Sequence, residues 1–352
     1  MAETAITNCH IHTFTTAHAP AYYPMRPVAL FRLFPGLVSG LRWAARFQPW
    51  ERIYDTLFRL ENFHRTGRRL SQRDVLLEVL RYYPGDTRFV VLPMDMALIG
   101  HGPVRRDIGQ QHAELHALTK DPDFGHRIIP FATIHPDRAD GIEEFRRCVE
   151  EYGFRGLKIY PKLGYAPDHP VLMRQVYPIC EERGLPVISH CSRGGVRHKR
   201  WTQEQADQVT RPDACLPVLS AFPQMKLCLA HFGGDQEWRS YLTDGFDPLN
   251  PEARKANWVS RIADMIRSGD YPTLYTDISY TIFKFADYIP LLRLFLNDPR
   301  LRTRILFGSD FYMTRQEALS EKAISIRLRD ALGEDGFRQI AETNPRDWLG
   351  DG

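Results

Sequence analysis

The sequence lacks the features that mark several common protein classes. Its 352 residues contain six cysteines but no C-x-x-C pair. Neither a redox dithiol nor a disulfide-stapled secreted domain is indicated, and we expect a reducing, cytoplasmic setting. A charge excess is also missing, because 46 basic and 43 acidic side chains leave a formal net charge of +3. That balance gives no reason to expect a nucleic-acid partner.

Long apolar runs are missing as well. The most apolar early stretch, residues 28–47, contains Arg32, Pro35, Arg42 and Arg46, and it cannot cross a bilayer without burying those charges. The first residues show no basic segment followed by an apolar one, so we expect no signal peptide and no membrane partner.

Three motifs of nucleotide and acyl chemistry are absent. No G-x-G-x-x-G turn follows the first predicted strand, no G-x-S-x-G elbow occurs, and the glycine pairs 194–195 and 233–234 lack the following Lys-Ser/Thr of a phosphate loop. A dinucleotide fold and a serine hydrolase are therefore disfavoured. The glycine pairs are expected to let the chain turn close to a site.

Short apolar runs alternate with amphipathic segments along almost the whole chain. Apolar residues make up 43% and charged residues 25%, as in ordinary globular proteins, which excludes a disordered chain. Eight alternating β and α units predict parallel strands closed into a (β/α)8 barrel, with residues 1–352 as one domain. The predicted strands are 5–12, 88–94, 128–135, 156–160, 186–191, 226–231, 274–279 and 304–310. The predicted helices are 105–120, 141–152, 170–183, 212–221, 251–268, 285–297 and 315–332.

Residues 13–86 interrupt this rhythm. A structureless loop of that length is improbable in a compact domain, and its content predicts helices over 28–47, 51–64 and 71–83. Ser71 followed by Asp74 is typical of a helix start. We interpret the segment as a helical cap over the barrel mouth, with a subunit contact as an equal alternative.

The strongest chemical signal is Asn8-Cys9-His10-Ile11-His12 at the end of the first predicted strand. Residues two apart on a strand point the same way. Two histidines buried against the helix layer would need polar partners, whereas two at the barrel mouth can share one metal ion. The position of the motif therefore favours a metal site.

Polar residues also end three later strands. His190, His231 and Asp310 each follow an apolar run, on the predicted strands 186–191, 226–231 and 304–310. A carboxylate there is costly unless it is paired or bound to a cation, and the carboxyl ends of barrel strands carry the chemistry of this fold. A strand-end histidine hydrogen-bonded to its neighbours would explain each one singly, but hardly all together.

This order of H-x-H, His, His and Asp resembles the amidohydrolase superfamily. In detail it is similar to the amidohydrolase-2 branch, which groups aminocarboxymuconate-semialdehyde and resorcylate decarboxylases with lactonase-like hydrolases. The likeness extends over nearly the whole chain outside the cap and includes the segments 156–160, 275–277 and 344–349. Asn8 departs from it, since the superfamily often has an acidic residue before H-x-H.

The resemblance implies that His10, His12, His190 and Asp310 bind one divalent ion, Zn²⁺ or another first-row metal such as Mn²⁺. Imidazoles and a carboxylate suit Zn²⁺, and such an ion lowers the pKa of bound water to about 7. His231 would act beside it as an acid–base or polarising group, and Asp310 would accept and pass on the water's proton.

Lys158 and Tyr160 share one face of the predicted strand 156–160. In some superfamily branches a carboxylated lysine at this position bridges two metals. Lys158 could also bind a substrate carboxylate or form an internal ion pair. The branch that the sequence resembles is generally mononuclear, which favours one ion per chain.

Further substrate contacts are expected around the mouth. Arg193 has the planar fork that suits a carboxylate, although a solvated loop arginine is an equal reading. His135 and Asp277 either line the pocket or satisfy a neighbouring backbone group. Residues 198–200 form a basic loop that could attract an anion, with a plain solvated run as the simpler explanation.

The sequence therefore predicts a metal-dependent enzyme that hydrolyses a small cyclic or aromatic lactone, ester or amide. The alternatives are non-oxidative decarboxylation of an aromatic or unsaturated acid, hydration of a carbon–carbon double bond, and a binding protein without turnover. The expected partner is a small, possibly anionic substrate, and a homodimer is expected from the resemblance alone.

Overall fold

The computed structural model describes residues 5–23, 67–243, 245–281, 285–311 and 320–351. All eight predicted strands are present, and the third is split in two. The strands are β1 (Thr7–Ile11), β2 (Arg88–Val91), β3 (Ile128–Pro130), β4 (Ala132–Thr133), β5 (Leu157–Ile159), β6 (Val187–Ser189), β7 (Leu227–Leu229), β8 (Leu274–Asp277) and β9 (Ile305–Leu306).

The strands pair in parallel and in sequence order, as β1–β3 and β4–β9. Phe131 connects the two sheets, because its N–H donates to the Val91 carbonyl while Ala132 bonds to Gly156 on the next strand. The ring also closes between its ends. The Cys9 N–H donates to the Phe307 carbonyl at 2.8 Å, and the Asp310 N–H donates to the His10 carbonyl at 2.8 Å.

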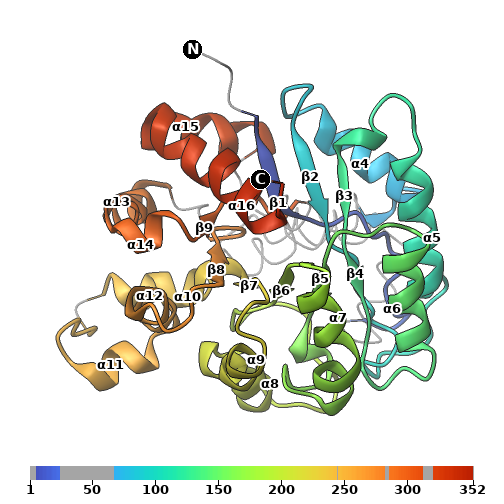
Figure 1. The fold of residues 1–352 in the computed structure, drawn as a ribbon, viewed down its shortest axis with the longest axis horizontal. Helices are drawn as coiled ribbons and strands as arrows, with labels where there is room; N and C mark the ends of the chain where they lie inside the picture. The colour runs from blue at the N-terminus through green and yellow to red at the C-terminus, as the bar shows by residue number, and fades with distance from the viewer. Residues whose placement is uncertain (1–4, 24–66, 244, 282–284, 312–319, 352) are drawn as a thin grey trace, which may run out of the picture.

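The fold is thus the predicted (β/α)8 barrel, with strands around the centre of Figure 1 and helices outside them. The helices are α4 (Gln72–Leu80), α5 (Ile108–Thr119), α6 (Gly141–Glu150), α7 (Tyr177–Glu182), α8 (Gln203–Thr210), α9 (Leu216–Ala221), α10 (Asp235–Tyr241), α11 (Pro251–Ala256), α12 (Trp258–Ser268), α13 (Phe285–Asn297), α14 (Pro299–Arg302), α15 (Glu321–Arg338) and α16 (Asn344–Leu349).

Some helix boundaries differ from the sequence prediction. The predicted helix 251–268 is two helices, because the Asn257 side chain accepts from the Ser260 N–H at 2.9 Å and so begins α12. The predicted helix 170–183 starts as a π-helix, Leu172–Val176, before α7. The sequence analysis did not predict α8 and α10, which follow β6 and β7 directly.

Of the helices predicted within residues 13–86, those at 28–47 and 51–64 lie outside the described residues. The third is α4, which begins as predicted: the Ser71 hydroxyl accepts from the Asp74 N–H, and the Asp74 carboxylate accepts from the Ser71 N–H. Its buried Val75, Leu76 and Val79 pack into the main core. This helix is therefore the barrel helix between β1 and β2.

A register shift on β1 decides where the H-x-H motif points. Asn8 pairs with Phe89 and Ile11 with Val91, so three residues on β1 oppose two on β2. Ile11 joins Val91 in the outer core, between strands and helices. His10 and His12, on either side of Ile11, consequently face the barrel interior.

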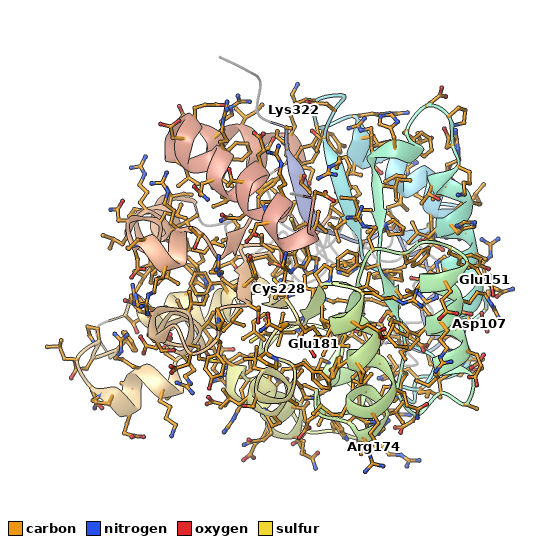
Figure 2. The ribbon with its side chains drawn as sticks, in the orientation of Figure 1. Asp107, Glu151, Arg174, Glu181, Cys228 and Lys322 are labelled. Carbon is orange, nitrogen blue, oxygen red and sulfur yellow. The ribbon has the colours of Figure 1, made fainter. Side chains whose placement is uncertain are left out.

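The barrel interior is a second, smaller core. It contains Cys9, Val90, Ile188 and Cys228, and Figure 2 places Cys228 near the centre, whereas labelled charged residues such as Arg174 lie at the rim. Lys158 pairs in register with Ile188, so it occupies this inward face. Among the described residues, no helix is both long and apolar enough to span a membrane.

Candidate metal centre

Three of the predicted ligands meet at the carboxyl end of the barrel. His10 lies on β1, His12 directly follows that strand, and Asp310 follows β9; their exposed fractions are 0%, 4% and 5%. The Asp310 Oδ1 atom lies 3.2 Å from His12 Nε2 and 3.7 Å from His10 Nε2. These atoms form one of the groups among the described residues that are compact enough to hold an ion.

The outer nitrogens of both imidazoles fix their tautomers. His10 Nδ1 lies 2.9 Å from the Asp277 carboxylate, and His12 Nδ1 lies 2.7 Å from the Leu92 carbonyl. Both partners only accept, so each Nδ1 carries the proton and each Nε2 turns a lone pair toward Asp310. Such carboxylate–histidine and carbonyl–histidine pairs are typical of metal ligands.

Lone pairs of His10, His12 and Asp310 point toward one another, and a cation would fit among them. His10 Nε2 and Asp310 Oδ1 are buried and have no hydrogen-bond partner. Burial first, and then the charge of Lys158, lowers the pKa of His10 to about 3, which keeps its imidazole neutral. Two imidazoles and one carboxylate form a donor set that suits Zn²⁺ or Mn²⁺.

Asp277 accepts several hydrogen bonds beside the donor set. Its carboxylate accepts from His10, from the His231 backbone N–H at 3.0 Å and from the Ser279 backbone N–H at 2.9 Å, and the Ser279 hydroxyl also contacts it. His10, His231 and Asp277 form a second compact group. Ser279 was not singled out in the sequence, although its position two residues after Asp277 in the predicted strand 274–279 was a signal.

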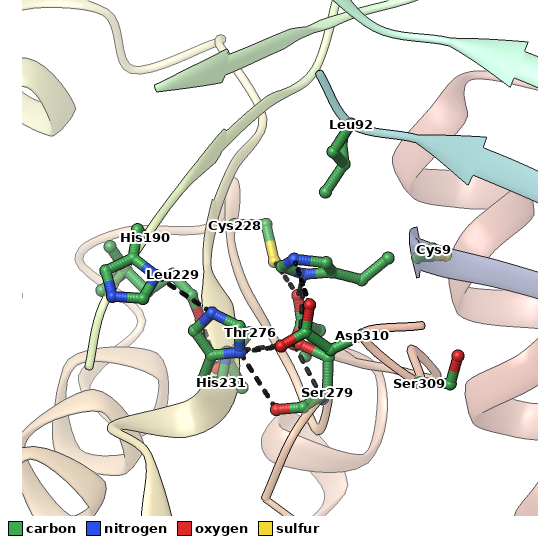
Figure 3. Close-up of polar contacts among 12 residues, drawn as sticks. Cys9, Leu92, His190, Cys228, Leu229, His231, Thr276, Ser279, Ser309 and Asp310 are labelled. Carbon is green, nitrogen blue, oxygen red and sulfur yellow. Dashed lines mark hydrogen bonds and ion pairs between the residues drawn. The ribbon is translucent and has the colours of Figure 1, made fainter. Parts of the chain in front are cut away.

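His190 lies apart from the other three predicted ligands. Its Nδ1 is 3.1 Å from His231 Nε2 (Figure 3), and its Nε2 is 3.1 Å from the Gly194 carbonyl. His231 Nδ1 faces the Ser279 carbonyl at 3.1 Å. Carbonyls at both ends need two N–H donors, and burial lowers the pKa of both imidazoles. When both imidazoles are neutral, neither His190 Nδ1 nor His231 Nε2 carries a proton, and the contact between these two atoms lacks one.

The backbone is strained at two of the candidate residues. His231 has φ 67° and Asp310 has φ 58°, and Phe232 continues the turn with φ 43°. Non-glycine residues with positive φ are uncommon and gather at functional sites. Gly233 and Gly234, with φ 84° and 87°, complete the turn as their sequence predicted.

Lys158 enters the interior from β5, and Tyr160 follows the strand and belongs to the main core. The Lys158 Nζ is fully buried without a hydrogen-bond partner. Burial lowers its pKa to about 8, against the pull of Asp277 and Asp310. Tyr160 stacks on the His190 ring with centroids 4.0 Å apart, and its hydroxyl accepts from the Val196 N–H.

Two predicted substrate contacts have protein partners. Arg193 Nε lies 2.5 Å from Glu237, its Nη1 lies 3.1 Å from Asp207, and the guanidinium lies over the Trp258 ring at 4.6 Å. His135 is buried with its ring against Tyr165, and its Nε2 has no hydrogen-bond partner. The Arg193 guanidinium is therefore bound by two carboxylates of this chain.

Lys162 is a buried cation that the sequence analysis did not single out. Its Nζ donates to the carbonyls of Ser192, Arg193 and Gly194 at 3.2, 2.5 and 3.1 Å, and it lies 3.4 Å from Asp207. The same Gly194 carbonyl faces His190. Only the fold reveals this role, because the lysine follows β5 and its partners follow β6.

The barrel and the donor set together define a class of metal-binding barrel enzyme, and comparison with known proteins agrees. The family model described as "Amidohydrolase" matches residues 9–350. The chain belongs to this metal-dependent enzyme family, as the sequence predicted. No protein with a curated description matches the chain.

Solved structures with the same fold are distant in sequence. One is a 5-carboxyvanillate decarboxylase from Sphingomonas paucimobilis, at 14% identity and TM-score 0.55, with 99% of each chain covered. Another is a 2,6-dihydroxybenzoate decarboxylase from Rhizobium, at 16% identity and TM-score 0.53, with 99% and 100% covered. A third, a 5-carboxyvanillate decarboxylase from Novosphingobium aromaticivorans complexed with manganese and a nitrobenzoic acid, has 13% identity, TM-score 0.56 and 98% and 96% coverage.

Proposed function

We propose that this protein is a metal-dependent carboxy-lyase that removes CO2 from an aromatic acid. The observation that carries the proposal is the Lys158 ammonium, buried without a hydrogen-bond partner in the interior that also holds the donor set. A buried ammonium without a hydrogen bond is costly, even with the Tyr160 ring centroid 5.8 Å from its Nζ. A carboxylate at the centre would offset that cost, whereas a neutral lactone would not.

The similar structures also support decarboxylation over hydrolysis. Three of them are decarboxylases whose names specify aromatic acids, and one holds manganese. The hydrolysis of a lactone, ester or amide, which was the main expectation from the sequence, stays a prediction. Among the described residues, no feature favours hydrolysis over decarboxylation.

The ligand residues in this proposal are His10, His12 and Asp310, and the resemblance adds His190. The ion would supply a Lewis acid that binds the substrate carboxylate. The Lys158 ammonium would face the same substrate carboxylate and hold the acid in one orientation. Asp277, by fixing the tautomer of His10, keeps the Nε2 lone pair facing Asp310 and would leave it available to an ion.

The reaction replaces the carboxylate by a proton at the same ring carbon. The carbon takes the proton, the bond to the carboxyl carbon breaks, and its electron pair stays on the ring as CO2 leaves. We assign the proton transfer to Asp310, whose Oδ1 has no hydrogen-bond partner and faces the space between His10 and His12. Its carboxylate would first take a proton from water and then pass it to the ring carbon. His231 Nε2 is already opposite His190.

The test is product analysis with the purified, manganese- or zinc-loaded protein. Hydroxybenzoates labelled at the carboxyl carbon are incubated beside a panel of lactones and aryl esters. Release of labelled CO2 that depends on the metal and is lost in Asp310→Asn supports the lyase. A new acid from the lactones or esters, with no CO2 from the benzoates, would overturn it in favour of the hydrolase.

A further inference from the structure

The Lys162 side chain is bound to the backbone of the loop that follows β6. It is 1% exposed. An ammonium has three donors, and three consecutive carbonyls, those of Ser192, Arg193 and Gly194, lie within 3.2 Å of its Nζ. Asp207 lies 3.4 Å from the same atom and balances its charge. These charge-assisted hydrogen bonds fix where the carbonyls point.

One of these carbonyls has a second partner in the candidate metal centre. The Gly194 carbonyl oxygen lies 3.1 Å from Lys162 Nζ and 3.1 Å from His190 Nε2. A carbonyl oxygen has two lone pairs and can accept from both groups. Burial lowers the pKa of His190, which keeps its ring neutral. The single ring proton is therefore on Nε2, and Nδ1 has none.

The opposite side of the His190 ring shows why this tautomer needs support. His190 Nδ1 lies 3.1 Å from His231 Nε2, and His231 Nδ1 lies 3.1 Å from the Ser279 carbonyl (Figure 3). That carbonyl places the proton of His231 on Nδ1 and leaves a lone pair on its Nε2. A proton on His190 Nδ1 would form a hydrogen bond to this lone pair. The observed arrangement gives up that bond, so it depends on the Gly194 carbonyl.

The His190 ring itself is confined. Tyr160 stacks on it with centroids 4.0 Å apart and an angle of 10° between the planes. A Cβ built on Gly195 would lie 3.1 Å from His190 Nε2, and the Val196 N–H donates to the Tyr160 hydroxyl at 3.0 Å. The loop that carries the Gly194 carbonyl thus closes over the ring. With the ring orientation set in this way, the position of the carbonyl decides the position of the proton.

We propose that Lys162 is a positioning residue that, through the Gly194 carbonyl, keeps the proton of His190 on Nε2 and its Nδ1 lone pair free for the metal ion. The inference rests on the proposed function in one respect, namely that His190 is a ligand of the ion. Outer partners of this kind set the tautomer of ligand histidines. Lys162 acts through the backbone of the loop, by holding in place the acceptor that His190 needs.

The tautomer of His190 is measured on the metal-free full chain labelled with 15N-histidine, by long-range 1H–15N correlation spectra of the imidazoles at pH 7. The His190 signals are those that disappear in His190→Asn. Wild-type protein is expected to carry the proton on Nε2. Lys162→Met should carry it on Nδ1, where it can bond to His231, because the loop carbonyls lose their donor.

Gln203→Ala is the matched control for this experiment. The Gln203 amide donates to the Arg193 carbonyl at 2.7 Å, so its loss removes a donor from the same loop and leaves the contact between Lys162 and Gly194 intact. The proton of His190 should stay on Nε2. If Lys162→Met does not fold, Lys162→Gln replaces it. Its shorter, neutral amide cannot serve three carbonyls, so a mixture of the two tautomers is expected.

Titration of the same variants with Zn²⁺ against a chelator measures the consequence for the metal. Lys162→Met is expected to bind Zn²⁺ about 10- to 100-fold more weakly than wild type, and Gln203→Ala should bind it equally well. A wild-type proton on Nδ1 would overturn the proposal, as would a folded Lys162 variant with the proton wholly on Nε2. A shifted proton with unchanged Zn²⁺ affinity would also overturn it, because the ion would then not need His190 Nδ1.

The proposed function fails separately, because neither measurement involves turnover. The expected tautomers and affinities without CO2 release would leave Lys162 in this role and remove the lyase.

Discussion

Asp277 and His10 form a fully buried pair, with the carboxylate 2.9 Å from His10 Nδ1 and both side chains at 0% exposure. The pair sets the tautomer of His10 and, with it, the direction of the lone pair that faces Asp310. Asp277 also accepts from the His231 backbone. One carboxylate thus orients two of the candidate residues.

Asp277→Asn is therefore expected to weaken metal binding by about 10- to 100-fold, as loss of such partners commonly does. An amide can present an N–H to His10 Nδ1 and so favour the wrong tautomer. Metal affinity is measured by titration against a chelator, with the thermal midpoint recorded for both proteins. Unchanged affinity in a folded variant would show that Asp277 does not position His10.

His12→Ala is expected to abolish metal binding while the barrel still folds. Wild-type protein should contain about one ion per chain by elemental mass spectrometry, the ion that we assign to the group of His10, His12 and Asp310. His126→Ala, at an exposed histidine, is the control and should keep its metal. Full metal content in His12→Ala would disprove the site; two ions per wild-type chain would assign Lys158 to a bridge.

His231→Ala is expected to keep the metal and lose most of the turnover, because the His231 ring packs against His10 and His190 at centroid distances of 4.9 Å and its loss would leave space beside the donor set. Its imidazole contacts His190 and Ser279 and does not lie in the group formed by His10, His12 and Asp310. Metal content and product formation are measured on the same preparation. Loss of the ion in this variant would make His231 a ligand instead.

Lys158 is expected to make stability depend on alkaline pH. Its folded-state pKa is about 8, below its ordinary value of 10.5, so folding is opposed while the group is protonated, and the penalty disappears between pH 8 and 10.5. The full penalty corresponds to roughly 3 kcal/mol. Metal-free Lys158→Met should therefore be more stable than metal-free wild type at pH 7.

The difference between these two proteins should shrink as the pH rises toward 10.5. Urea denaturation at several pH values measures it, and taking the difference removes the contribution of the tyrosines that titrate in both proteins. A gap that is constant or widens with pH would mean that Lys158 is neutral or paired in the folded protein.

Gly195→Ala is expected to lower the free energy of unfolding by about 1–3 kcal/mol, the cost of a strained backbone position. Its φ is +94°, and a Cβ would overlap the Tyr160 hydroxyl. Gly194→Ala is the matched control, because its nearest neighbour would be the Ser192 Oγ at 3.7 Å. Equal denaturant midpoints for the two variants would show that Gly195 is not confined.

The barrel could be predicted from the sequence because alternation of apolar runs and amphipathic segments is local. Strand ends were also readable: His10, His12 and Asp310 were expected to meet, and they do. The bulge on β1 was not predicted, since it depends on which residues of β2 lie opposite. It decides which face the H-x-H motif occupies.

The contacts of loop residues could not be predicted in the same way. Arg193 was expected to face a substrate or the solvent, but Asp207 on α8 and Glu237 on α10 both reach it. Neither helix was predicted, so neither carboxylate could be placed. The contact between His190 and His231 likewise depends on the positive φ of His231. No pattern of residues in the sequence predicts that conformation for a histidine.

The three carbonyls held by Lys162 have a mechanical consequence. The ammonium ties the chain just after β5 to a loop 31 residues further on, and so encloses π-helix Leu172–Val176, α7 and β6 in a loop closed without a covalent bond. Unlike a disulfide, this contact does not persist in the unfolded chain, so it stabilises the folded loop and leaves the unfolded state unrestricted. Because these hydrogen bonds join an ammonium ion to carbonyl oxygens, reducing agents do not break them. This part of the barrel mouth should therefore keep its shape at any redox potential.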